Sequence, residues 1–147
     1  MGITVKIKKL NKNAQVPSFG SAFAAGADLY ACIDHTMIIQ PGQTCMIPTG
    51  FAMEIPAGYA GLIFARSGMA SKRGLAPANK VGVIDCDYRG EVMVALHNHS
   101  GEEAAVDVQE RVAQLVIMPV PEVVFEEADE LQDTVRGEGG FGSTGTK

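Results

Sequence analysis

The chain has 147 residues, which suits a single domain that buries roughly two-thirds of the surface exposed in its unfolded form. Its formal net charge of -5 argues against general nucleic-acid binding, because that binding needs a broad basic surface. No segment approaches the roughly 20 apolar residues of a membrane span. We therefore expect no nucleic-acid partner and no membrane partner.

The cysteines indicate a reducing environment. Cys32, Cys45 and Cys86 are odd in number, are widely spaced and form neither a CxxC pair nor a Cys/His cluster typical of zinc. Such residues are usually free thiols, which persist where thiols are kept reduced. We expect a cytoplasmic protein that folds without disulfide bonds.

The apolar residues follow the short period of β-structure. Ile3, Val5 and Ile7 alternate with polar residues, as in a half-buried strand. From Met37 onward, apolar pieces about one strand long are separated by proline and glycine, and residues 112–120 and 123–125 continue this rhythm. The pattern predicts an all-β fold, a sandwich or a jelly-roll barrel, rather than an α/β fold.

The stretch VGVIDCDYRGE, residues 81–91, concentrates functional groups between two apolar runs. Val81, Val83 and Ile84 suit a buried strand, and apolar residues within 92–96 share one face of a returning strand, which predicts a β-hairpin. Aspartate and glycine also close hairpins that have no function. The bend would present four polar or charged side chains: Asp85, Asp87, Tyr88 and Arg89.

One short helix is predicted at SGMASKRG, residues 67–74, with Ser67 as its N-cap and Gly74 as its terminator. Its amino end, beside Arg66, would suit an anion, although serine-capped helices are common without any ligand. Asp28, in the segment AAGADLYA, is by itself typical of an ordinary turn.

The end of the chain, RGEGGFGSTGTK, has five glycines among its last twelve residues and cannot form a core element alone. We expect a β domain over residues 1–135 and a flexible arm over residues 136–147. A disordered tail has this composition, and so does a segment that becomes ordered over a phosphorylated ligand.

Five stretches in this order resemble the homotrimeric dUTP diphosphatases. Each motif is weak alone, but the order and the spacing are those of the family, and the resemblance runs from Ala25 to Gly145. The stretches are AGADLYA at 25–31, RSGMA at 66–70, GVIDCDYRGE at 82–91, ERVAQL at 110–115 and RGEGGFGSTG at 136–145.

The resemblance implies a jelly-roll subunit, a homotrimer with shared active sites, Mg²⁺, and hydrolysis of dUTP to dUMP and pyrophosphate. It implies that Asp85 activates the water that attacks the α-phosphorus and that Tyr88 packs beneath the deoxyribose. Asp28 would support the hydrated metal from the outer sphere. The implied substrate contacts are Asn79, Val83 and Ile84 for uracil; Arg66, Ser67, Gly68 and Gln114 for phosphates; and Arg136, Phe141, Gly142, Ser143 and Thr144 in a closing arm.

Two places in the sequence depart from the family pattern. Gln109 and Glu110 stand where Gly-Asp is usual, which leaves the local turn and the partner of Arg111 open. Ala65 stands where proline often precedes the Arg-Ser pair, which leaves the lead-in to the predicted helix less defined.

Two other functions are compatible with parts of this pattern. A dCTP deaminase or a bifunctional deaminase-diphosphatase has the same fold, but it usually carries a glutamate base and lacks the aspartate and tyrosine found here at residues 85 and 88. A non-catalytic nucleotide-binding module would lack the base or the arm, and this chain has both. Release of ammonia from dCTP identifies a deaminase. Release of pyrophosphate from dUTP distinguishes the enzyme from a non-catalytic binding module.

Overall fold

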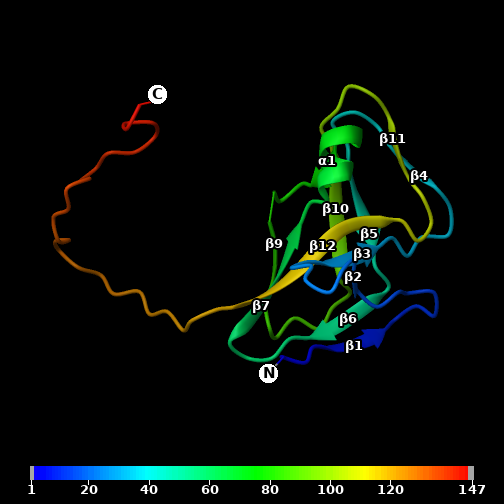
Figure 1. Cartoon of the computed structure of the whole chain (residues 1–147), viewed down its shortest axis with the longest axis horizontal. Coiled ribbons are helices and arrows are strands. Elements are labelled where there is room, and N and C mark those ends of the chain that lie inside the picture. Colours follow the sequence, from blue (N-terminus) through cyan, green and yellow to red (C-terminus); the bar gives the residue numbers. More distant parts are fainter. Residues whose placement is uncertain (1, 146–147) are drawn as a thin grey trace.

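The computed structural model describes residues 2–145, in which it has twelve strands and one helix (Figure 1). The strands are β1 (Lys6–Lys9), β2 (Ser18–Phe19), β3 (Ala27–Tyr30), β4 (Met37–Ile39), β5 (Thr44–Pro48), β6 (Phe51–Glu54), β7 (Tyr59–Phe64), β8 (Leu75–Pro77), β9 (Gly82–Ile84), β10 (Met93–Asn98), β11 (Ala104–Val106) and β12 (Arg111–Pro119). The helix α1 (Ser67–Arg73) lies between β7 and β8 in the sequence.

Every strand pair in the described chain is antiparallel. The largest sheet has five strands in the order β2-β3-β12-β7-β9, and a second sheet has the order β5-β10-β8. The pairs β1-β6 and β4-β11 complete the body. This architecture confirms the predicted all-β fold with one short helix.

The core lies where the inward faces of these sheets meet. Leu29 of β3, Ile47 of β5, Phe51 of β6 and Leu96 of β10 are fully buried and belong to one apolar cluster. Alternation explains which strand residues are buried, because every second residue of a strand points to the same face. In β10, for example, the burial alternates along the whole strand.

The predicted hairpin over residues 81–96 is wrong. β9 pairs with β7 in the large sheet, whereas β10 pairs with β5 and β8 in the other sheet. The chain between them therefore crosses from one sheet to the other. Val83 points outward and is 64% exposed, while Ile84 is buried, so only one of the two can face the core.

The predicted strand at residues 123–125 is also absent. After β12 the chain leaves the body as an extended segment, coloured orange to red in Figure 1. Val124 is 84% exposed and Phe125 is 95% exposed. These residues have the composition of a strand, but the segment has no partner strand within the described part of this chain.

Helix α1 ends as predicted but begins differently. Arg66 is the N-cap and makes no side-chain capping bond, so Ser67 is the first helical residue rather than the cap. Gly74 adopts φ 68 at the C-cap, in the left-handed region that favours glycine. A Cβ on Gly74 would lie 2.5 Å from Cβ of Ser100, so packing also requires glycine there.

We expect Gly74→Ala to lower the free energy of unfolding by about 2–4 kcal/mol, because it combines backbone strain with a steric clash. Gly42→Ala is the matched control, since Gly42 has φ 75 but a Cβ added there would meet no heavy atom within 4 Å. The free energy of unfolding of Gly42→Ala should fall by only about 1 kcal/mol. Equal losses in urea denaturation would show that the Ser100 contact contributes nothing.

Candidate active site

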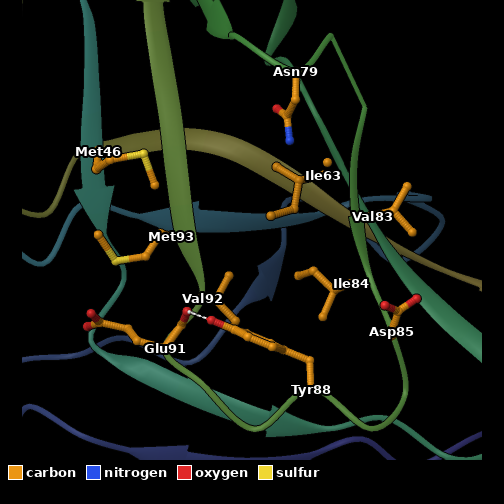
Figure 2. Close-up of a pocket in the computed structure, with 11 residues that line it drawn as sticks. Met46, Ile63, Asn79, Val83, Ile84, Asp85, Tyr88, Glu91, Val92 and Met93 are labelled. Carbon is orange, nitrogen blue, oxygen red and sulfur yellow. Dashed lines mark hydrogen bonds between the residues drawn. The ribbon is translucent and has the colours of Figure 1, made fainter.

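The nucleoside half of the candidate site is a pocket of about 290 Å³ between the two sheets (Figure 2). It brings together five residues that the sequence predicted for one site. Met46 of β5 and Met93 of β10 also line it, and no sequence motif indicated either methionine. The five predicted residues are Asn79, Val83, Ile84, Asp85 and Tyr88.

The loop that carries Asp85 and Tyr88 is a tight turn held by its own hydrogen bonds. The Tyr88 amide donates to the Asp85 carbonyl at 3.1 Å, and Arg89 Nη1 donates to the Cys86 carbonyl at 2.7 Å. The Tyr88 hydroxyl donates to the Glu91 carbonyl at 2.9 Å, which is the dashed line in Figure 2. Asp85 remains exposed and can therefore reach a ligand and water.

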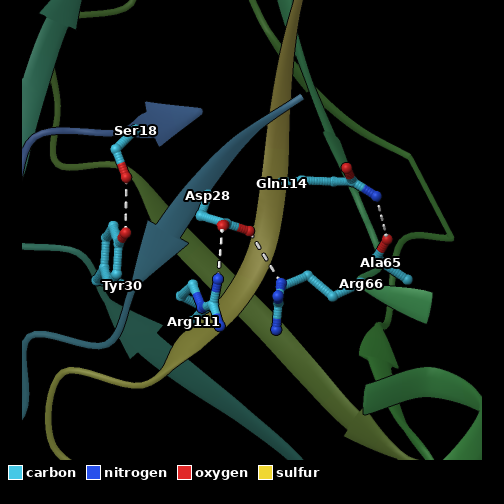
Figure 3. A network of polar contacts seen from close by, with 7 residues as sticks. All are labelled: Ser18, Asp28, Tyr30, Ala65, Arg66, Arg111 and Gln114. Atoms are coloured by element: carbon cyan, nitrogen blue, oxygen red, sulfur yellow. Dashed lines mark hydrogen bonds and ion pairs between the residues drawn. The ribbon is translucent and has the colours of Figure 1, made fainter. Parts of the chain in front are cut away.

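The second half of the candidate site is an ion-pair network around Asp28 (Figure 3). Asp28 is buried, and its Oδ1 accepts a hydrogen bond from Arg66 Nε at 2.9 Å. Its Oδ2 accepts one from Arg111 Nη1 at 3.4 Å. Asp28 is therefore the partner of Arg111, which the sequence alone did not identify.

Strand register explains why these distant residues meet. Gln114 of β12 lies opposite Asp28 of β3 on one side and opposite Phe64 of β7 on the other. The chain that follows Phe64 carries Ala65 and Arg66, and Gln114 Nε2 donates to the Ala65 carbonyl at 2.8 Å. The first turn of α1 then leaves Ser67 and Gly68 exposed beside Arg66.

The unusual Gln109-Glu110 pair forms a defined turn. Gln109 adopts φ 60, a conformation that favours glycine, and its side chain is held by Gln15 at 2.8 Å and by the Asn13 carbonyl at 2.7 Å. Glu110 forms an ion pair with Arg73 at the end of α1. These contacts stabilise the turn in a conformation that its sequence does not favour.

The two halves do not meet within one chain. Ile84 lies opposite Gly61 of β7, and Gln114 lies opposite Phe64 on the other side of that strand. Strand geometry then separates Ile84 from Gln114 by about 14 Å: roughly 10 Å along β7 and two spacings of about 4.8 Å across it. Asp85 lies farther still, because β9 runs away from Phe64 as it reaches residue 85.

The glycine-rich arm approaches neither half. Arg136, Phe141, Gly142, Ser143 and Thr144 lie in the extended segment, far from the body in Figure 1. The contacts of this segment are local; Arg136 Nε donates to the Gly139 carbonyl at 2.8 Å, for example. Residues 146 and 147 of the predicted arm fall outside the described range.

The acidic residues do not form a metal cage. In residues 2–145, no group of three or more His, Cys, Asp or Glu side chains could hold a metal ion. Both oxygens of Asp28 already accept bonds from guanidinium groups. Magnesium is commonly held by one or two carboxylates together with water and substrate phosphates, and such an ion needs no cage of three protein ligands.

This antiparallel β fold combines a pocket beside an exposed aspartate with a separate cluster of arginines, an arrangement typical of a nucleotide-binding protein. The sequence model described as dUTPase matches residues 12–145. The chain therefore belongs to the dUTPase family. No helix in the described residues is long and apolar enough to cross a membrane.

Relatives and solved structures agree with this assignment. The chain is 51% identical over 146 residues to the deoxyuridine 5'-triphosphate nucleotidohydrolase of Desulfitobacterium hafniense, with 97% of each chain covered. It is 47% identical over 143 residues to that of Syntrophotalea carbinolica, again with 97% of each covered. The structure of the Staphylococcus bacteriophage 80alpha dUTPase with dUpNHpp matches with a TM-score of 0.88 at 29% identity, covering 97% of this chain and 99% of that one.

We expect Asp28→Ala to lower the free energy of unfolding by about 1–3 kcal/mol, because it leaves Arg66 and Arg111 without their buried acceptor. Glu54→Ala is the control, since Glu54 forms an exposed pair with Lys6 at 3.0 Å. The free energy of unfolding of Glu54→Ala should fall by no more than about 0.5 kcal/mol. Chemical denaturation of both variants tests the difference, and equal stabilities would contradict it.

Proposed function

We propose that this dUTPase hydrolyses dUTP to dUMP and pyrophosphate with Mg²⁺, at sites that the subunits of a homotrimer share. The reaction would keep uracil out of DNA and supply dUMP for thymidylate synthesis. Membership of the dUTPase family supports the reaction. The observation that carries the mechanism is the exposed Asp85 beside Tyr88 in a nucleoside-sized pocket.

The nucleoside half would select both the base and the sugar. Asn79 and the backbone of residues 82–84 line the pocket and offer donors and acceptors to the uracil edge. Cytosine presents the opposite pattern at N3 and C4, so it would leave buried groups unpaired. Tyr88 would pack beneath the deoxyribose and exclude a ribose 2′-hydroxyl.

The second half of the site, the ion-pair network around Asp28, is the proposed phosphate half. It would neutralise and align the triphosphate. This substrate carries about four negative charges, so its in-line hydrolysis needs positioned cations and N–H donors. Arg66 donates through Nε to Asp28, which fixes its guanidinium plane and leaves the terminal nitrogens for phosphate oxygens. Ser67, Gly68 and Gln114 lie beside it as further donors.

Asp85 would act as the general base, taking a proton from the water that attacks the α-phosphorus. Mg²⁺, when bound, would offset phosphate charge, with Asp28 supporting its hydration shell. A mutant dUTPase from phage phi11 of S. aureus, which matches with a TM-score of 0.78 at 26% identity over 87% of this chain and 98% of that one, coordinates a structural Mg(II) ion.

The divided geometry supports a shared site. Within one chain the strands that lead to Asp85 and to Gln114 lie on opposite sides of β7, whereas a symmetric neighbour can bring a second copy of either half alongside. The segment after Pro119 extends away from the body of its own chain, as an arm that closes over a neighbour's site would have to do. Three free cysteines in the described chain suit the proposed cytoplasmic location.

We expect Asp85→Asn to bind dUTP but lose roughly 10² to 10⁴ in turnover, because the amide keeps the shape and cannot accept the proton. Pyrophosphate release under saturating dUTP measures turnover, and binding of dUpNHpp measures affinity. Turnover near that of the unmodified protein would remove Asp85 from the role of base.

Complementation between two inactive variants tests the shared site. One variant carries Asp85→Asn with an intact arm, and the other keeps Asp85 but ends before Arg136. When the two are unfolded, mixed equally and refolded, random assembly should give about a quarter of sites with a good base and a neighbour's good arm. Each variant refolded alone is the control. Mixed trimers as inactive as the two controls would show that base and arm come from the same subunit.

A further inference from the structure

Glu91 lines the nucleoside pocket at the end of the Asp85–Tyr88 loop, and it makes two contacts of different kinds. Its Oε1 accepts a hydrogen bond from the Gly50 amide at 3.0 Å. Its backbone carbonyl accepts the Tyr88 hydroxyl at 2.9 Å. The same residue therefore contacts both the body of the protein and the aromatic side chain in the pocket.

Gly50 is held in place by close packing and by backbone hydrogen bonds. It adopts φ 75 in the turn between β5 and β6, and a Cβ there would lie 2.7 Å from Sγ of Cys32. Its carbonyl accepts bonds from the amides of Leu10 at 2.8 Å and Asn11 at 3.0 Å. Burial, with the nearby Glu91 carboxylate, raises the pKa of the Cys32 thiol, which is consistent with close packing at this turn.

The chain is fixed immediately after Glu91 but not before it. The Val92 amide donates to the Phe51 carbonyl at 2.9 Å, and Thr49 Oγ1 donates to the Val92 carbonyl at 2.6 Å. By contrast, the hydrogen bonds found within residues 85–90 stay inside the loop or end at Glu91. Glu91 is thus the junction between a rigid strand and a loop exposed to solvent.

We propose that Glu91 is a positioning residue for sugar selection: its carboxylate, held by Gly50, fixes the end of the loop that carries Tyr88, whose hydroxyl bonds to the Glu91 carbonyl. This inference rests on the proposed role of Tyr88 against the ribose 2′-hydroxyl. Without the carboxylate, the Val92 amide still holds the Glu91 carbonyl in place, but the loop before Glu91 loses its side-chain anchor to Gly50. The ring can then move aside and admit a ribose.

Gly90 makes the arrangement possible. A Cβ on Gly90 would lie 2.9 Å from Cε2 of Tyr88 and closer to the ring's hydroxyl end, so the ring lies directly against the backbone. In Figure 2 the tyrosine extends along the loop toward Glu91, with Val92 beside it. Ring position is therefore set by the loop backbone, and the backbone by the Glu91 contact.

The test compares kcat/KM for dUTP and UTP in Glu91→Ala, Glu91→Gln and a control, Glu103→Ala. Glu103 also accepts one side-chain bond, from Gln40 at 3.2 Å, and it does not line the nucleoside pocket. We expect the dUTP/UTP ratio to fall about tenfold in Glu91→Ala, mainly through faster UTP hydrolysis. The ratio should stay within about threefold in Glu91→Gln, whose amide oxygen can still accept from Gly50, and should be unchanged in the control.

Tyr88→Phe provides a second variant that leaves Glu91 untouched. It removes only the hydroxyl bond to the Glu91 carbonyl, and we expect it to lower the ratio to a similar extent. Hydrogen exchange adds a readout that needs no activity: the Gly50 amide and residues 85–92 should exchange faster in Glu91→Ala than in Glu91→Gln.

An unchanged ratio in folded Glu91→Ala or in Tyr88→Phe would overturn the proposal, even if either variant were less stable. Unchanged exchange in Glu91→Ala would overturn the physical link on which it depends. If the unmodified protein hydrolysed dUTP and UTP equally, the proposed role of Tyr88 would fail instead, and this result is distinguishable because it appears before any substitution.

Discussion

The register of β3, β12 and β7 is the constraint on which the phosphate half of the site depends. Gln114 lies between Asp28 and Phe64, so one row of the sheet brings three separate sequence motifs together. A shift of one residue would turn Gln114 to the opposite face and remove it from Ala65. The Asp28 ion pairs with Arg66 and Arg111 then lock the charged side chains onto this row.

The same sheet keeps Asp85 away from these arginines. β9 lies at the edge of the sheet beyond β7, and its register carries Asp85 away from the Gln114 row. The separation of Ile84 from Gln114 follows from the hydrogen bonding of the sheet. The proposed shared site would make activity depend on the interface between subunits as well as on each chain.

Local signals in the sequence were sufficient for much of the fold. Alternation along residues 92–96 and the glycine at position 74 each have a local physical cause, and both behave as predicted. Pairing of strands is not local, which is why the hairpin prediction was wrong: residues 82–84 form a strand, but its partner is β7. The same reason applies to Val124, whose apolar neighbours read as a strand although the described chain offers them no partner.

In the candidate site, too, local features could be predicted from the sequence and contacts between distant residues could not. The family resemblance had grouped the five residues that line the pocket, and they lie within one short stretch of the sequence. Arg111 could not be assigned a partner, since its contact with Asp28 spans 83 positions and depends on the bulge in β12. Glu91 makes its contacts through a turn amide and its own backbone carbonyl, and neither has a sequence signature.

Whether different subunits bind one nucleotide is tested most directly by a crystal structure of the protein with dUpNHpp and Mg²⁺. We expect a single bound analogue to contact Asp85 and Tyr88 of one subunit and Arg66 and Gln114 of another. An analogue bound to Asp85 and Arg66 of the same chain would contradict the shared site.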